Sequence, residues 1–106
     1  MSTDALMPLN LVESIAYQAD AVVSRTLVKT DAGTVTLFAF GKGQELSEHT
    51  TPFDALVHVL DGEAKIRINQ DTYSVGEGEL LIMPANEPHA LGAIEPFKML
   101  LTMIKA

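Results

Sequence analysis

Short segments typical of β-strands follow one another from residue 21 to the C-terminus, with turn residues between them. The clearest covers residues 63–68, where apolar and charged side chains alternate as in a strand with one buried face. The turn signals include Asp31-Ala32-Gly33 and Asp61-Gly62, and the second predicts a hairpin. Strands at such short, regular spacing predict an all-β fold, either a closed barrel or a two-sheet jelly roll, since both dispose of exposed sheet edges.

About eight strands are expected, at residues 21–30, 34–40, 53–60, 63–68, 72–75, 80–83, 89–94 and 97–105. We predict that 80–83 lies buried, because all four of its residues are apolar, and that 41–48 forms a polar loop. The first 20 residues hold the only helix-like spacing and predict a loose arm or one helix of a few turns. The expected organisation is an N-terminal arm at 1–20 and a β-barrel at 21–106.

Composition excludes several classes of protein. A length of 106 residues supports one domain, and the lack of cysteine removes disulfides, thiolate nucleophiles and cysteine-based zinc sites. A net charge of −7 without a basic stripe argues against nucleic-acid and anionic-membrane partners. With neither a signal-peptide pattern nor an apolar run of about 20 residues, we expect a cytoplasmic protein. The 47% hydrophobic content of so small a chain predicts a homodimer.

The three histidines are His49, His58 and His89. We expect His49 and His89 each at a junction between a loop and the start of a strand, and two such junctions can meet at one mouth of a barrel. Imidazole nitrogen suits Zn, Cu, Fe and Ni. From the residues alone, a shared metal site and ordinary separate histidines both remain open.

Two motifs give the chain a resemblance to a known family. Gly43, five residues, His49 and later Gly62 resemble the first cupin motif, Gly-x5-His-x-His, three or four residues, then Glu-x6-Gly. Gly78-x5-Pro84-x-Asn86-x2-His89 resembles the second, Gly-x5-Pro-x-Gly-x2-His-x3-Asn. The resemblance covers roughly half the chain and implies a cupin-type jelly-roll β-barrel with a short N-terminal arm.

The departures from the family pattern fall at metal-ligand positions. Thr51 stands where the family has its second histidine, Ala55 where it has the glutamate, and Ala93 where it often has asparagine. Asn86 replaces a glycine, which only concerns the turn, because asparagine tolerates left-handed backbone.

The resemblance implies a divalent transition metal (Fe, Ni, Mn or Zn) held by His49 and His89, with His58 as the candidate third ligand. Strand parity opposes His58: if position 55 faces the barrel interior, position 58 faces out, unless a bulge lies between them. Both orientations remain open.

Other side chains offer alternatives at the site. Asp54 and Glu48 are the nearest carboxylates that could replace the missing glutamate, although a backbone hydrogen bond and a solvated loop are their more ordinary roles. We interpret Met83, Met99 and Met103 as core residues rather than copper ligands. Three functions therefore compete: a metal-dependent enzyme, a barrel that binds a small molecule without catalysis, and a structural or storage protein.

Overall fold

The computed structural model describes residues 7–105, which form nine β-strands and one short 3₁₀ helix, η2 (Val12–Ser14). The strands are β1 (Val22–Thr30), β2 (Gly33–Phe40), β3 (Glu45–His49), β4 (Phe53–Asp61), β5 (Glu63–Ile68), β6 (Asp71–Gly76), β7 (Leu80–Met83), β8 (His89–Gly92) and β9 (Phe97–Lys105). Within the described residues no helix is long and apolar enough to cross a membrane.

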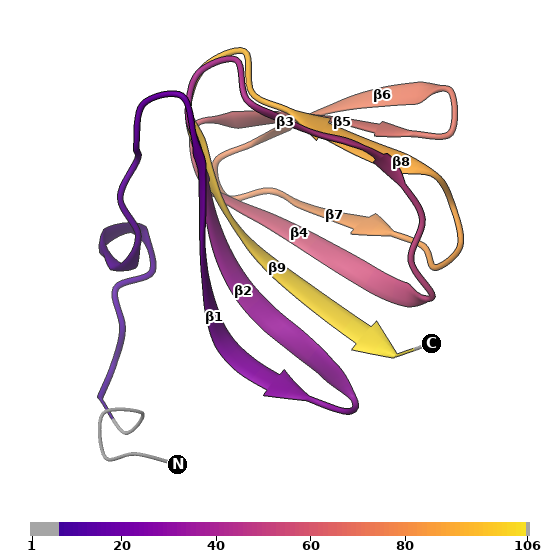
Figure 1. Cartoon of the computed structure of the whole chain (residues 1–106), viewed down its shortest axis with the longest axis horizontal. Helices are drawn as coiled ribbons and strands as arrows, with labels where there is room; N and C mark the ends of the chain where they lie inside the picture. The colour runs from indigo at the N-terminus through magenta and orange to yellow at the C-terminus, as the bar shows by residue number, and fades with distance from the viewer. Residues whose placement is uncertain (1–6, 106) are drawn as a thin grey trace.

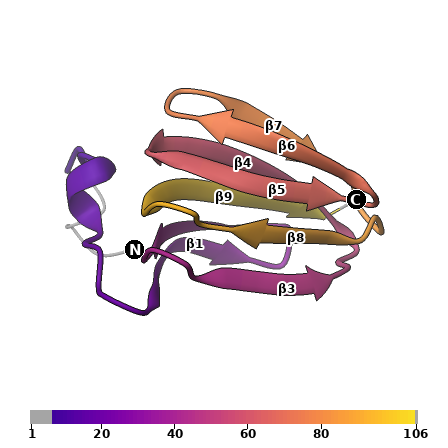
Figure 2. The ribbon, with the colours of Figure 1, turned by 90° about the horizontal axis from the view of Figure 1, so that it is seen from above.

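The strands form two antiparallel sheets that face each other (Figures 1 and 2). One sheet has five strands in the order β1-β2-β9-β4-β7, and the other has four in the order β3-β8-β5-β6. Between them lies the main core, built from Phe40, Ala55, Val57, Val59, Ala64, Ile66, Val75, Met83, Leu91, Ala93, Phe97 and Met99. The prediction of an all-β jelly-roll barrel is confirmed.

The side chains of β2 belong to two hydrophobic clusters, one on each face of the strand. Phe38 and Phe40 point into the barrel and belong to or pack on the main core. Leu37 and Ala39 point the other way, because successive strand residues face opposite sides, and they are fully buried against Ile15 of the N-terminal arm. The arm therefore covers part of the outer face of the five-stranded sheet (Figure 1).

Polar contacts fix the described part of the arm, residues 7–20, to the barrel. The Lys98 ammonium donates a hydrogen bond to the carbonyl of Val12 at 2.6 Å, and the Tyr17 hydroxyl donates one to Asp61 Oδ2 at 2.6 Å. Burial and the Asp61 carboxylate raise the pKa of Tyr17, so the hydroxyl keeps the proton that it donates. Within residues 7–20 the arm forms one 3₁₀ turn, and no helix of a few turns is present in that range. Residues 1–6 of the predicted arm lie outside the described residues.

The predicted polar loop at 41–48 is wrong over its second half, which forms β3 and supplies the ninth strand. In β3 only Leu46 is shielded from solvent to any degree. This strand lies at the edge of the four-stranded sheet and pairs only with β8. An edge strand with polar side chains lacks the hydrophobic alternation by which strands are recognised, and that is why the prediction missed it.

The predicted hairpin at Asp61-Gly62 is also wrong, because β4 and β5 belong to different sheets and do not pair. Gly62 instead carries the chain from one sheet to the other with a φ of +77°. A Cβ at this position would collide with the carbonyl oxygen of Pro96. Glycine is required there by both the left-handed backbone and the close approach of another segment.

The prediction that residues 80–83 lie buried fails for two of the four. Met83 faces the core, but Leu80 and Ile82 are 54% and 58% exposed on the outer face of β7. β7 is an edge strand of the five-stranded sheet. One of its faces packs on the core, and no segment among residues 7–105 covers the other. By contrast, the predicted inward orientation of Ala64, Ile66 and Ile68 in β5 is confirmed.

Candidate functional site

Two of the three histidines meet where β3 ends and β8 begins. His49 and His89 are direct cross-strand partners, and their Nε2 atoms lie 3.1 Å apart. The ring centroids are 4.3 Å apart and the ring planes meet at 69°, so the two nitrogens lie side by side rather than on one line. The structure therefore brings together His49 and His89, whose meeting the sequence left open. His89 begins a strand as expected, but the same expectation is wrong for His49, which ends one.

An irregularity in β3 turns His49 inward. Leu46 pairs with Leu91, and three residues later His49 pairs with His89, which is only two residues from Leu91. The extra residue on β3 is a β-bulge, and it lets Leu46 and His49 share the inner face despite their odd spacing. Without the bulge, strand alternation would send His49 to the opposite face.

Each ring is oriented by its other nitrogen. Nδ1 of His49 lies 2.8 Å from the carbonyl oxygen of Ser47, and Nδ1 of His89 lies 3.1 Å from that of Glu87. A carbonyl oxygen only accepts hydrogen bonds, so each Nδ1 carries the hydrogen and each neutral ring presents an unprotonated Nε2. The two Nε2 atoms lie at hydrogen-bond distance from each other, and two such nitrogens can share a proton or coordinate the same cation.

The two histidines differ in their access to solvent. His89 is only 3% exposed, whereas His49 is exposed. Burial lowers the pKa of His89, partly opposed by its hydrogen bond to the Glu87 carbonyl and reinforced by the nearby His49. His89 is therefore held as the neutral base, which is the form that coordinates metal.

A small cavity lies on the inner side of the pair, with a volume of about 30 Å³. It is lined by both histidines and otherwise only by apolar or thioether side chains: Leu46, Ala55, Met83, Leu91, Met99, Leu101 and Met103. A volume of this size holds about one water or one ion, since a water needs roughly 10–15 Å³ on this measure. Organic-ligand pockets are usually about 300–1,000 Å³, so the cavity is far too small for such a ligand.

Two methionines lie beside Ala55, the position at which the cupin motif has glutamate. Ala55 on β4 pairs with Met83 on β7 and with Met103 on β9. Cross-strand partners share one face of a sheet, so Met83 and Met103 flank Ala55 on the inner face. From the sequence we placed Met83, Met99 and Met103 in the core. All three line the cavity, and only the register between strands reveals this.

His58 is not part of the pair. It lies on the outer face of β4, between Leu80 of β7 and Leu100 of β9. Ala55 and Val57 on the inner face are at most 1% exposed, and no bulge separates them from His58. The geometry therefore offers two converging histidines rather than the expected set of three.

The candidate carboxylates are engaged elsewhere. Asp54 Oδ1 accepts a hydrogen bond of 2.9 Å from the backbone amide of Ala85, which is its expected ordinary role. Glu48 forms an ion pair of 2.9 Å with Arg67. Across residues 7–105 no group of three or more histidine, aspartate or glutamate side chains is placed to hold a metal ion.

The substituted motif positions have structural roles. Thr51 Oγ1 accepts a hydrogen bond of 3.2 Å from the amide of Phe53, and its carbonyl accepts one of 2.8 Å from the amide of Asn86. Asn86 has a φ of +68°, which confirms that asparagine supplies the left-handed conformation here. Both residues therefore shape the loops that carry the site.

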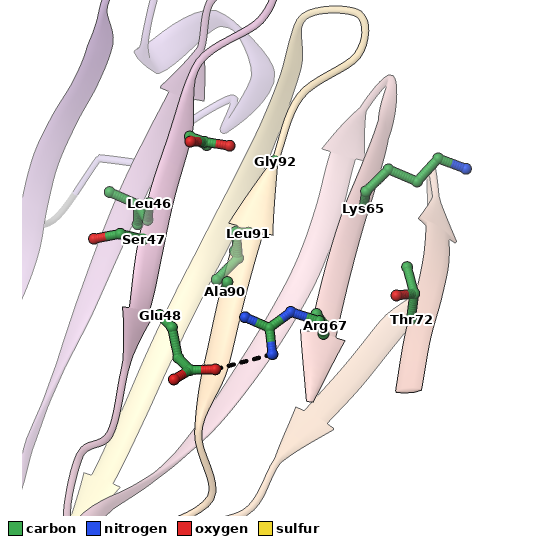
Figure 3. A pocket seen from close by; sticks show the side chains of 10 residues that line it. Leu46, Ser47, Glu48, Lys65, Arg67, Thr72, Ala90, Leu91 and Gly92 are labelled. Atoms are coloured by element: carbon green, nitrogen blue, oxygen red, sulfur yellow. Dashed lines mark ion pairs between the residues drawn. The ribbon is translucent and has the colours of Figure 1, made fainter. Parts of the chain in front are cut away.

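A larger, shallow depression lies on the outer face of the four-stranded sheet, with a volume of about 450 Å³ (Figure 3). Its two cationic side chains already have anionic partners. Arg67 pairs with Glu48, as Figure 3 shows, and Lys65 lies 3.0 Å from Glu63. Exposed ion pairs of this kind contribute little to stability, and they leave neither cationic side chain free to select an anionic ligand.

Two antiparallel sheets with a histidine pair at one end define a small double-sheet jelly-roll barrel. The sequence profile described as the cupin domain matches residues 36–104. The chain belongs to the cupin family.

Solved structures give the same assignment. A conserved protein of unknown function from Streptococcus pyogenes, SPY1581, is 44% identical, with a TM-score of 0.90 over 94% of this chain and 88% of its own. A cupin superfamily protein from Desulfitobacterium hafniense is 30% identical, with a TM-score of 0.90 over 94% and 92%. A cupin 2 conserved barrel domain protein from Leptotrichia buccalis is 43% identical, with a TM-score of 0.89 over 92% of this chain and 47% of that one. No curated protein matches the chain.

Proposed function

We propose that the protein binds a transition-metal ion through Nε2 of His49 and Nε2 of His89. The observation that carries this proposal is the pair of Nε2 atoms 3.1 Å apart, each on a ring whose Nδ1 faces a backbone carbonyl. Metal-binding histidines characteristically donate their other ring N–H to such a carbonyl, which fixes tautomer and orientation.

The separation also fits two neighbouring ligands on one ion. Nitrogens each about 2.0–2.1 Å from an ion, at an angle of about 90–110°, lie about 2.9–3.4 Å apart. The observed 3.1 Å falls within this interval. The donor set therefore fits a metal, although neither His58, the candidate third ligand, nor the carboxylates of Asp54 and Glu48 join the pair.

The alternative is a barrel that binds a small organic molecule without metal. The cavity volume of about 30 Å³ favours an ion over such a molecule. A bound ion would supply Lewis acidity or redox chemistry at the mouth. On the protein side, exposed His49 leaves the site open to solvent while buried His89 holds the ion against the apolar interior. We assign no reaction and no substrate.

The test is elemental analysis of untagged protein, as purified and after incubation with Fe, Ni, Mn, Zn and Cu. We expect near-stoichiometric metal in the wild type and its loss in His49→Ala and His89→Ala. His58→Ala is the matched control, because His58 lies on the outer face, and it should retain the metal. Wild-type protein that binds none of these ions, or loss in all three variants alike, would overturn the proposal.

The homodimer stays a prediction, and one surface can be named for it. Leu80 and Ile82 of β7 and Ile104 of β9 are each about half exposed on the outer face of the five-stranded sheet. Leu56 continues this apolar surface beside His58. We propose that a second copy covers this face, which is the part of the sheet beyond the arm-covered cluster around Ile15.

A further inference from the structure

Resting on the proposed function, we infer that the ion bound by His49 and His89 is cuprous copper, with the thioethers of Met83 and Met103 supplying further ligands. The inference concerns the side chains that line the same cavity as the histidine pair. It assigns the two methionines that flank Ala55 a role in metal selection.

The first step is the composition of the wall. Apart from the two imidazoles, all donor atoms lining the cavity are thioether sulfurs, from Met83, Met99 and Met103. Thioethers are soft ligands that select Cu(I), and imidazole also accepts copper. Carboxylate, carbonyl and water are the ligands that suit Mg, Ca and Mn, and no carboxylate lines this cavity.

The second step is the position of the sulfurs. Met83 and Met103 pair with Ala55 from either side on the inner face of the five-stranded sheet. Alanine is small enough to leave room above it, and its flexible neighbours can fill irregular space. Met99 lies four residues before Met103 along β9, about 13 Å at strand rise. Met99 and Met103 therefore line different parts of the wall, and we assign the ligands to the residues beside Ala55.

The third step is burial. Met83 is 2% exposed, Ala55 is 1% exposed and Met103 is partly buried, so most of the inner wall is shielded from solvent. The cavity of about 30 Å³ leaves little space for the hydration shell that Mg²⁺ and similar hard ions keep. A soft ion that takes its ligands from side chains fits this surrounding better.

The experiment is an anaerobic competition titration of full-length protein with Cu(I), supplied as its acetonitrile complex, against a chromophoric Cu(I) chelator. A parallel titration uses Zn(II). Met83→Leu and Met103→Leu keep nearly the same volume and polarity apart from the sulfur. Each should weaken Cu(I) binding at least about tenfold, since even loss of supporting partners costs about 10–100-fold. Binding of Zn(II) should change little in either variant.

Met99→Leu is the matched control within the same cavity, and it should leave Cu(I) affinity unchanged. Weaker binding in Met99→Leu alone would overturn the assignment of Met83 and Met103. Unchanged Cu(I) affinity in both flanking variants would overturn the role of the thioethers altogether.

Ala55→Glu tests the same idea in the opposite direction. It places a carboxylate beside the histidines, where the cupin motif carries glutamate, and should raise the affinity for Mn(II) relative to Cu(I). An Ala55→Glu protein that folds, as judged by circular dichroism, and keeps its preference for Cu(I) would contradict the inference.

The outcomes separate this inference from the proposed function. If Zn(II) or Ni(II) binds in a manner that depends on His49 and His89 while Cu(I) does not bind, the copper inference fails and the histidine site stands. If no ion binds in a histidine-dependent manner, both fail. Histidine-dependent Cu(I) binding that also requires Met83 or Met103 supports both.

Discussion

The inner and outer faces of β4 carry similar side chains but meet very different surroundings. Ala55, Val57 and Val59 on the inner face are at most 1% exposed and pack between the two sheets. His58 and its outward neighbours Leu56 and Leu60 are only half-buried. The strand therefore separates a closed interior, which holds the candidate site, from an open apolar surface.

The same separation explains the different fates of the histidines. His49 reaches the interior because a bulge in β3 turns it inward, and it meets His89 there. His58 stays outside because β4 keeps strict alternation between positions 55 and 58. Residue type alone therefore does not identify the converging histidines. The face of the sheet on which each imidazole lies decides which of them converge.

The strongest test of this difference between the two faces places the same charge on each face of β4. Val57→Asp puts an unpaired carboxylate into the core and should lower the free energy of unfolding by about 3–5 kcal/mol. His58→Asp, one residue along, should cost about 1 kcal/mol or less, because its carboxylate can reach solvent. Urea denaturation of both variants measures the difference. Equal losses would show that the outer face is as tightly enclosed as the inner one.

A smaller effect concerns pH and the buried His89, whose facing titratable neighbour is His49. Burial lowers the pKa of folded His89, whereas the unfolded chain has the ordinary value of about 6.5. As pH falls below about 6.5 the unfolded state binds a proton first, so this contribution to stability is complete above that pH and is lost toward the lowered folded value.

We therefore expect metal-free wild type, kept in chelator, to lose stability between neutral and mildly acidic pH more steeply than His89→Gln. Thermal melts across that range give the comparison. Parallel curves for the two proteins would mean that His89 does not carry the pH dependence.

The smallest effect on folding is expected at the outer face. Ile82→Asp alters an exposed side chain on β7 and should change the free energy of unfolding by about 0.5 kcal/mol or less. It should nevertheless shift the protein toward monomer, because it places charge in the proposed interface. Sedimentation velocity at micromolar concentration measures this, with Thr72→Asp on the four-stranded sheet as control. A wild-type monomer would contradict the dimer.

Much of the fold could be predicted from local signals. The alternation of apolar and charged residues at 63–68 identified β5 and its buried face. In a strand with one buried face, successive side chains point alternately to the core and to solvent. Edge strands carry a weaker signal. The polar β3 was missed, and the apolar β7 was expected to be buried, because an edge strand is covered on fewer sides than its composition suggests.

Part of the site could also be predicted. The motif spacing around His49 and His89 indicated that these histidines could meet, as they do. Strand alternation argued against an inward His58 but left its orientation open. The methionines beside Ala55 could not be recognised, because residues 55, 83 and 103 become neighbours only through the register of three strands.

The sequence by itself determined the strand-rich class, because side-chain periodicity is a local property. The resemblance of its two motifs to the cupin pattern pointed to His49 and His89, and left His58 open. The tertiary structure alone decided the bulge that turns His49 inward, the outer position of His58 and the presence of thioethers in the cavity that the histidine pair lines. These features depend on pairing between distant strands, where a shift of one residue moves a side chain to the other face of the sheet.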